Sequence, residues 1–294
     1  MNPQEQIRQL KFNEVTNLKI GTLLRVTDIN EADNNFKKLK DLGFTSCQLV
    51  YKPEKYTSDA AKIIKEAAEK NSIEISAQFC GYNDNDTVWD NYYGFNTSGL
   101  NIEAYRKSRL EYIKSAAEFA HEAGITDIVI HAGFIPNNPF APEYSTLLTA
   151  VAMICDHCKK MDMNVLLETG GEAAVALLRL ITDLGKDNIF VNLDPANMLM
   201  YGYANPVDAL YTIGKYVRNF HGKDGVVPTD PRVLGAETPV GEGMVDFYKV
   251  FKKLKELGYN RFITIEREIT GDKQTEDILK AKAYFENLLS ELNF

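Results

Sequence analysis

A strand-like segment followed by a helical segment recurs along the whole chain, and this repetition constrains the fold more than any other feature. Short runs rich in Val, Ile, Leu or Phe are typical of strands buried on both faces. They predict eight strands, at residues 18–24, 46–51, 73–79, 126–131, 164–168, 189–194, 217–221 and 262–266. Between them, apolar residues at helical spacing predict helices, as at 102–120 and 244–257.

Glycine follows four of the predicted helices, in the short segments D-L-G, E-A-G, D-L-G and E-L-G that end at Gly43, Gly124, Gly185 and Gly258. A glycine there suits the left-handed position that terminates a helix. Eight units in 294 residues average about 37 residues each, which is the expected size of the unit in a (β/α)8 TIM barrel. The alternative is a doubly wound open sheet, but no strand is followed by the G-x-G-x-x-G of its usual dinucleotide site.

The net charge and the hydropathy of the chain argue against two kinds of partner, nucleic acid and membrane. The net charge of −8 repels phosphate backbones, so nucleic acid is not an expected partner. Residues 1–12 lack the apolar stretch of a signal peptide, and no run of about 18 apolar residues occurs. We therefore expect a cytoplasmic protein without a membrane partner. With no Pro/Gly/Ser linker and no low-complexity stretch, residues 1–294 are expected to form a single domain.

The four cysteines are too few for a disulfide scaffold. Cys155 and Cys158 form a C-x-x-C, but no second pair follows and the flanking residues 147–161 have a helical pattern. Core packing is therefore the preferred interpretation, and a redox or zinc site is the alternative.

Four successive predicted strands end in a side chain that can bind a metal: Glu168, Asp194, His221 and Glu266. In a barrel these strand ends converge on one opening, where three carboxylates would repel one another. A divalent cation removes this conflict, and oxygen ligands with one imidazole suit Mn2+, Co2+, Mg2+ or Zn2+. The alternative is that each residue separately caps a helix or forms an ion pair.

A single metal site with carboxylates on either side suits removal of a proton next to a carbonyl, through an enediolate. Glu168 and Glu266 come from the predicted fifth and eighth strands, so they can flank the metal. We assign both to metal binding and to proton transfer.

Two connections are long, residues 80–100 and 222–243, and both follow the carboxyl end of a strand, where barrel active sites form. The first is rich in aromatic residues, and Trp89 is predicted to bind substrate there. The alternative is that these aromatics form the contact of a homodimer.

The segments LLETGGE, NLDPANMLMYG, HGKDG, PVGEG and TIERE, within residues 166–272, resemble the sugar-phosphate isomerase/epimerase superfamily, the xylose isomerase-like barrels. Its members include ketose 3-epimerases, hydroxypyruvate isomerase, inosose isomerase and dehydratase, and endonuclease IV. The resemblance covers essentially the whole chain. It implies a TIM barrel, one divalent metal ion and acid–base glutamates, with the four ligands at Glu168, Asp194, His221 and Glu266.

Two positions differ from the ketose 3-epimerases: Asn197 stands where they carry a histidine, and Val227 where they carry an arginine. Asn197 can still hydrogen-bond a sugar hydroxyl. The substrate of the ketose 3-epimerases nevertheless cannot be assigned to this chain. Glu172 lies near the position of a second acid that the family uses for substrate contacts, and the resemblance implies that it binds substrate, although its spacing from Glu168 differs from that in the epimerases. Lys223 is predicted to bind a carboxylate, phosphate or hydroxyl of the substrate, and the alternative is a surface lysine.

Endonuclease IV uses the same barrel for three zinc ions and DNA. His131 matches one of its ligands, but its other histidines are missing here, which argues against a DNA phosphodiesterase. His131 is therefore predicted to line the substrate site, and the alternative is a structural histidine.

The function expected from the sequence is a metal-dependent isomerase or epimerase of small sugars. A dehydratase acting on an inosose or keto-sugar begins with the same proton removal and remains an alternative. A sugar-binding barrel without turnover is the third possibility considered.

Overall fold

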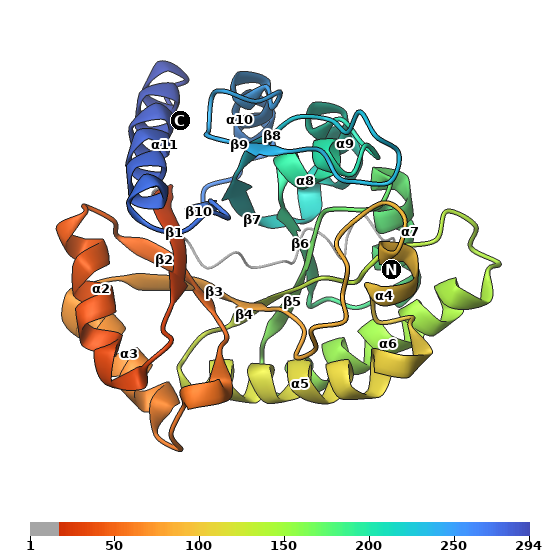
Figure 1. Ribbon diagram of the computed structural model, residues 1–294, viewed down its shortest axis with the longest axis horizontal. Coiled ribbons are helices and arrows are strands. Elements are labelled where there is room, and N and C mark those ends of the chain that lie inside the picture. The colour runs from red at the N-terminus through yellow and green to blue at the C-terminus, as the bar shows by residue number, and fades with distance from the viewer. Residues whose placement is uncertain (1–17) are drawn as a thin grey trace.

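The computed structural model describes residues 18–294, and in it eight parallel strands close into a barrel surrounded by helices (Figure 1). The strands neighbour one another in the closed order β1-β10-β7-β6-β5-β4-β3-β2. They are β1 (Lys19–Arg25), β2 (Ser46–Val50), β3 (Glu74–Cys80), β4 (Asp127–Ile130), β5 (Asn164–Glu168), β6 (Ile189–Leu193), β7 (Val217–Gly222) and β10 (Phe262–Ile265). Closure confirms the predicted TIM barrel and excludes the open sheet.

Helices connect the strands on the outside of the barrel. The longer ones are α2 (Ala32–Asp41), α3 (Ala60–Asn71), α5 (Glu103–Glu122), α6 (Pro142–Lys159), α7 (Ala174–Leu184), α9 (Pro206–Ile213), α10 (Phe247–Glu256) and α11 (Asp272–Glu291). Shorter helical segments are α4 (Gly94–Thr97), α8 (Pro195–Met200), η1 (Ile29–Glu31), η2 (Pro53–Lys55) and η3 (Gly214–Tyr216). The four glycines predicted to terminate helices have φ values of 59° to 77°, the left-handed backbone that a side chain disfavours.

The eight predicted strands are all present, and their ends differ by a residue or so from the prediction. The differences at the carboxyl ends are informative. Asp194 is not the last residue of β6 but the N-cap of α8, where its side chain accepts from the backbone N–H of Asn197. Glu266 and His131 likewise lie just beyond β10 and β4. Side chains at these positions leave the sheet at the mouth of the barrel.

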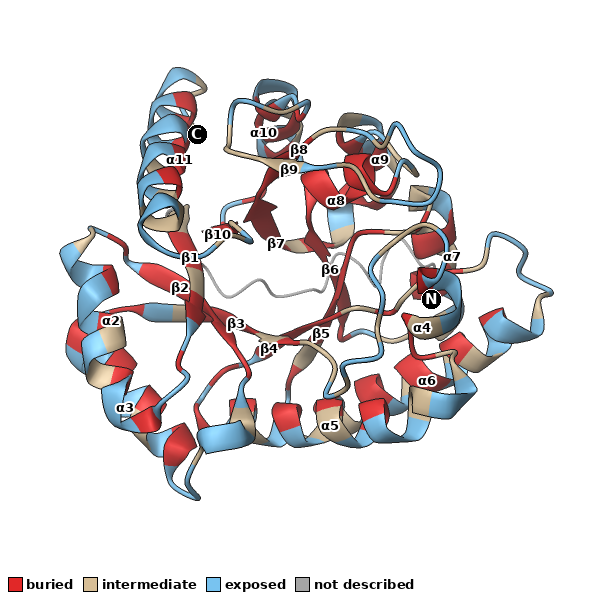
Figure 2. Ribbon diagram, in the orientation of Figure 1, coloured by how far each residue is buried: buried red, intermediate tan, exposed pale blue. Residues whose placement is uncertain are grey.

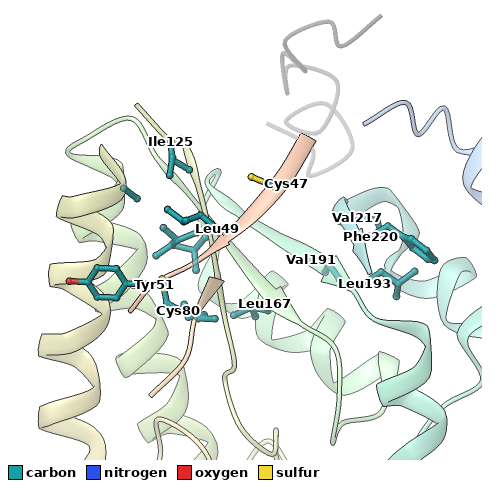
Figure 3. Packing of buried hydrophobic residues seen from close by; sticks show 14 of the residues in the cluster. Cys47, Leu49, Tyr51, Cys80, Ile125, Leu167, Val191, Leu193, Val217 and Phe220 are labelled. Atoms are coloured by element: carbon teal, nitrogen blue, oxygen red, sulfur yellow. The ribbon is translucent and has the colours of Figure 1, made fainter. Parts of the chain in front are cut away.

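Alternating residues along the strands face two different cores. Ala77, Val129, Leu166 and Phe190 form a small cluster contributed by four adjacent strands, which fills the barrel interior. The residues on either side of Val129, Leu166 and Phe190 belong to the large cluster between strands and helices, whose buried faces are red in Figure 2. Figure 3 shows this outer layer, where Tyr51 points toward α5 and its ring lies 5.4 Å from that of Tyr112.

The two long connections have ordered structure. Residues 81–93 lead from β3 to α4, and the connection after β7 contains the antiparallel pair β8 (Asp224–Gly225) and β9 (Glu237–Thr238). The carboxylate of Asp224 accepts from the backbone N–H groups of Gly225, Gly241, Gly243 and Val245, which explains how a loop rich in glycine is held in place.

Cys155 and Cys158 are buried on α6 with free thiols, as core packing requires, and burial raises the pKa of each to about 12. None of the described helices is both long and apolar enough to cross a membrane. Residues 1–12, on which the expectation of no signal peptide rests, lie outside the described residues.

Candidate metal centre

The two-residue period of the strands carries the four predicted ligands into the barrel interior. Glu168 follows Leu166 by two residues, so it faces inward one layer above that core residue. Asp194 follows Asn192 by two residues, and Asn192 follows the inward-facing Phe190 by two residues, so Asp194 also faces inward. Because the strands are parallel, their inward-facing ends meet at the same mouth of the barrel.

The four side chains meet there. One ligand atom from each of Glu168, Asp194, His221 and Glu266 lies within 4.8 Å of the other three, and all four residues are buried. Nδ1 of His221 lies 2.8 Å from Glu266 Oε2, 3.4 Å from Glu168 Oε1 and 3.7 Å from Asp194 Oδ2. The interpretation that each residue has a separate capping or pairing role does not account for this convergence.

Each of the four residues keeps one buried atom that has no hydrogen-bond partner among the described residues: Glu168 Oε2, Asp194 Oδ2, His221 Nδ1 and Glu266 Oε2. A buried polar atom without a partner is costly, and four in one place require an explanation. A divalent cation would satisfy all four at once, and the donor set of three carboxylates and one imidazole fits such an ion. Asp194 illustrates the division of roles, since its Oδ1 caps α8 and its Oδ2 would be available to such an ion.

His221 is oriented by a residue of β2. Its Nε2 lies 2.9 Å from Gln48 Oε1, while the Gln48 amide Nε2 points toward Asn192 Oδ1 at 3.5 Å. A carbonyl oxygen can only accept, so Nε2 of the imidazole carries a proton, and in the neutral imidazole Nδ1 carries the lone pair. The lone pair is therefore directed at the three carboxylates, which is the tautomer that a metal needs.

Negative charge dominates the centre when no ion is bound. Burial by itself lowers the pKa of His221, but the carboxylates of Glu266 and Glu168 raise it well above its usual value. Burial raises the pKa of Glu266, and the nearby positive charges of Lys223 and His221 more than offset this effect and hold it far below its usual range. The site thus attracts positive charge, either as protons or as a cation.

Lys223 is buried, so the interpretation of it as a surface lysine is wrong. Its Nζ donates to Glu268 Oε1 at 2.7 Å and to Asn197 Oδ1 at 3.2 Å, and it lies 3.7 Å from Asp194 and Glu266 carboxylate oxygens. Asn197 in turn donates to Glu168 at 3.2 Å. Lys223 and Asn197 therefore fix the ligands and reduce their repulsion, and Asn197 also lines the open cavity.

That cavity, of about 490 Å³, is lined by two of the four residues, Glu168 and Glu266. Its wall includes Glu168, Glu266, Asn197, His131 and Trp89. His131 Nε2 lies 3.8 Å from Glu168 Oε2, and the Trp89 ring lies 4.8 Å from the His131 ring. The structure thus brings these five predicted residues together in the wall of one cavity.

Glu172 lies in a small recess that Trp89, His131 and Glu168 also line. Burial raises its pKa to about 8, the charge of Glu168 adds to the effect, and the hydrogen bond from the Gly170 backbone N–H opposes it. Near neutral pH its carboxyl group is therefore mostly protonated and can donate a hydrogen bond.

Gln48 and Glu268 are site residues that the sequence reasoning missed. Gln48 is an isolated polar residue inside the strand-like run at 46–51, and a polar residue buried in such a run was a usable signal. Glu268 follows Glu266 by two residues, so the same inward register could have predicted it.

A family model described as "Xylose isomerase-like TIM barrel" matches residues 36–288. The chain belongs to this family. A solved structure of a xylose isomerase domain protein from Planctomyces limnophilus is similar over 94% of this chain and 99% of that one, with 30% identity and a TM-score of 0.85. A D-tagatose 3-epimerase-like protein shares the fold over 94% and 98% of the two chains, with 21% identity and a TM-score of 0.70.

Two curated relatives extend this comparison. An uncharacterised protein of Methanocaldococcus jannaschii is 27% identical over 96% of this chain and 93% of its own. An inosose dehydratase of Lacticaseibacillus casei is 23% identical over 64% of this chain and 72% of its own. Membership of the family supports an enzyme of the sugar isomerase and epimerase type, and it leaves the reaction and the substrate to be argued from the site.

Proposed function

We propose that this protein is a divalent-metal-dependent isomerase or epimerase of small sugars that transfers a proton at the carbon next to a carbonyl, through an enediolate. The observation that carries the proposal is the set of four buried, unpartnered ligand atoms beside an open cavity. Glu168, Asp194, His221 and Glu266 would hold one ion of Mn2+, Co2+, Mg2+ or Zn2+. When bound, the ion polarises the substrate carbonyl and stabilises the negative charge that develops on it.

Glu168 and Glu266 supply the proton transfer. Both line the same cavity, and they come from β5 and from the end of β10, strands separated in the barrel by β6 and β7. They therefore approach a bound sugar from different sides, so one carboxylate can remove a proton and the conjugate acid of the other can return one. A proton returned to the other face gives an epimer, and a proton returned to the neighbouring carbon gives an isomer.

The remaining residues would bind and orient the sugar. Asn197 and His131 offer hydrogen-bonding groups in the cavity wall, and Glu172 offers a carboxyl group in the adjoining recess. Trp89 and Tyr82 add aromatic faces to the same wall, which suit the C–H face of a sugar ring. Lys223 would act on the substrate indirectly, because its ammonium group is already surrounded by carboxylates and Asn197.

Solvent deuterium exchange tests the proposal. Protein stripped of metal and reloaded with Mn2+ is incubated in D2O with free and phosphorylated ketohexoses, ketopentoses and inososes. We expect deuterium at the carbon next to the carbonyl of at least one sugar, dependent on metal. Sugars that bind but never exchange would contradict the proposal and favour a binding protein without turnover.

Dehydration of an inosose or keto-sugar is the second candidate, favoured by the similarity to an inosose dehydratase. It begins with the same proton removal but then expels a hydroxyl group as water. The same incubation separates the two reactions, because dehydration lowers the substrate mass by one water and creates an absorbing enone.

A further inference from the structure

Arg109 is completely buried on the inner side of α5, although it carries a charge that no metal or substrate role requires. A buried charge persists only when it is fully paired and hydrogen-bonded. Nε and Nη2 of Arg109 donate to the two carboxylate oxygens of Asp84 at 2.8 and 3.0 Å. Nη2 also donates to Thr87 Oγ1 at 2.8 Å.

The same guanidinium reaches the far end of the connection. It donates to the backbone carbonyls of Thr97 and Gly99, at 2.7 and 2.8 Å. Its hydrogen-bond partners therefore all lie in residues 84–99, the segment that leaves β3 and forms α4 (gold in Figure 1). One side chain thus holds both ends of this connection against α5.

The segment between these two ends carries Trp89. The Trp89 ring is stacked on that of Tyr82, with an interplanar angle of 9° and a centroid separation of 6.0 Å. The Tyr82 ring is in turn held by Arg109, whose guanidinium lies 4.1 Å from the centre of that ring. Tyr82 in addition donates its hydroxyl to the carbonyl of His131 at 2.8 Å. A continuous series of contacts therefore joins Arg109 to the cavity wall.

We infer that Arg109 is a positioning residue for substrate binding: it holds residues 82–97 so that the Trp89 ring forms one wall of the sugar cavity. The inference rests on the proposed function for the identity of the ligand, but the contacts on which it depends lie outside the metal centre. Arg109 itself does not line the cavity.

Lysine cannot replace arginine in this role. The planar guanidinium presents five N–H donors in a fixed fork, and here they serve a carboxylate, a hydroxyl and two carbonyls at once. A lysine keeps the positive charge but offers three donors from one point. Arg109→Lys should therefore preserve the charge and release part of the segment.

Trp89 is the only tryptophan of the chain, so its fluorescence reports the position of this segment alone. The experiment compares acrylamide quenching of Trp89 in the metal-loaded wild type, Arg109→Lys and a matched control, Arg106→Lys. Arg106 lies on the same helix, is partly exposed and makes a single long contact of 3.5 Å to the Asn101 carbonyl. Circular dichroism and melting show whether each variant is folded.

We expect a larger quenching constant and a shifted emission maximum in Arg109→Lys, and wild-type values in Arg106→Lys. With a sugar that exchanges, KM should rise about tenfold while kcat changes about twofold or less, because a displaced binding wall weakens ground-state and transition-state binding alike. A stability defect alone would not produce this division between KM and kcat. Unchanged quenching in folded Arg109→Lys, or an unchanged KM, would overturn the inference.

Thr87→Val serves as a second variant if Arg109→Lys does not fold. It removes a hydroxyl that accepts from Arg109 Nη2 and donates to Asp84 Oδ1, and it leaves the Arg109–Asp84 pair in place. Because Thr87 itself lines the cavity, only the quenching of Trp89 is compared for this variant. We expect a smaller increase in the quenching constant than in Arg109→Lys, and wild-type quenching would count against the inference. If the wild type incorporates solvent deuterium into none of the sugars, the proposed function fails. The quenching comparison still decides whether Arg109 holds the segment.

Discussion

The Oε1 atom of Gln48 lies 2.9 Å from Nε2 of His221, at the ring nitrogen that does not face the carboxylates. Gln48 comes from β2 and His221 from β7, strands on different sides of the barrel. The contact fixes the imidazole tautomer and leaves Nδ1 free for a metal. We therefore expect Gln48 to affect metal affinity without being a ligand.

Gln48→Leu removes this acceptor and should weaken Mn2+ binding about 10–100-fold, as loss of a hydrogen-bond partner behind a metal-binding histidine usually does. Calorimetric titration of the metal-free protein measures the effect. Gln48→Glu retains an acceptor and is the matched control, expected to bind Mn2+ more tightly than the leucine variant. Equal affinities in the two variants would show that the hydrogen bond does not act on the metal.

Glu168→Gln and Glu266→Gln should each lower turnover by roughly 10²–10⁴-fold, because an amide cannot exchange the proton that a carboxylate transfers. The barrel should remain folded, since both side chains lie at its mouth rather than in the apolar clusters. Deuterium exchange measures the rate and circular dichroism the fold. Normal exchange in either variant would contradict its assignment to proton transfer.

His221→Ala should abolish the stabilisation that metal provides, with less effect on melting of the metal-free protein. An ion present at 100 times its dissociation constant adds about 2.7 kcal/mol to the free energy of unfolding. Thermal melting with EDTA and with added Mn2+ measures the difference. A variant that retains the full metal-induced shift would show that the ion binds elsewhere.

Metal affinity should fall as the pH is lowered. In the metal-free protein the carboxylates of Glu266 and Glu168 raise the pKa of His221 well above its usual value, so an ion must displace a proton from the imidazole. Below that pKa the apparent affinity should weaken by about tenfold for each pH unit. Titrations in buffers of different ionisation enthalpy detect the released proton, and binding without proton release would contradict this account.

Glu172 should make stability depend on pH in the opposite sense from an ordinary ion-paired carboxylate. Its folded-state pKa of about 8 lies above the unfolded value of 4.5, so folding takes up a proton between these two pH values. Its contribution is fully present below the unfolded pKa and is lost as the pH rises through about 8. Glu172→Gln should flatten this decline in the unfolding free energy of the metal-free protein, measured in urea at pH 5 and at pH 8.5, and an identical decline in the variant would argue against the raised pKa.

Much of the fold was predictable because it depends on local patterns. The alternation of apolar runs with helical spacing, and the glycines at helix ends, identified all eight strands and the barrel. The convergence of the four side chains of the candidate metal centre was also predictable, because each stands at the carboxyl end of a strand and parallel strands bring those ends together.

The partners of these side chains depended on the closed barrel. No local pattern pairs Gln48 with His221, 173 positions apart, and closure is what places β2 and β7 on the same interior. The burial of Lys223 and of Arg109 was also not predictable from the sequence. A cationic side chain is usually exposed, and it is buried only where the fold supplies enough acceptors. The sequence by itself determined which residues could hold a metal, and the tertiary structure decided which residues orient and surround them, because hydrogen-bond partners follow from contacts between distant segments.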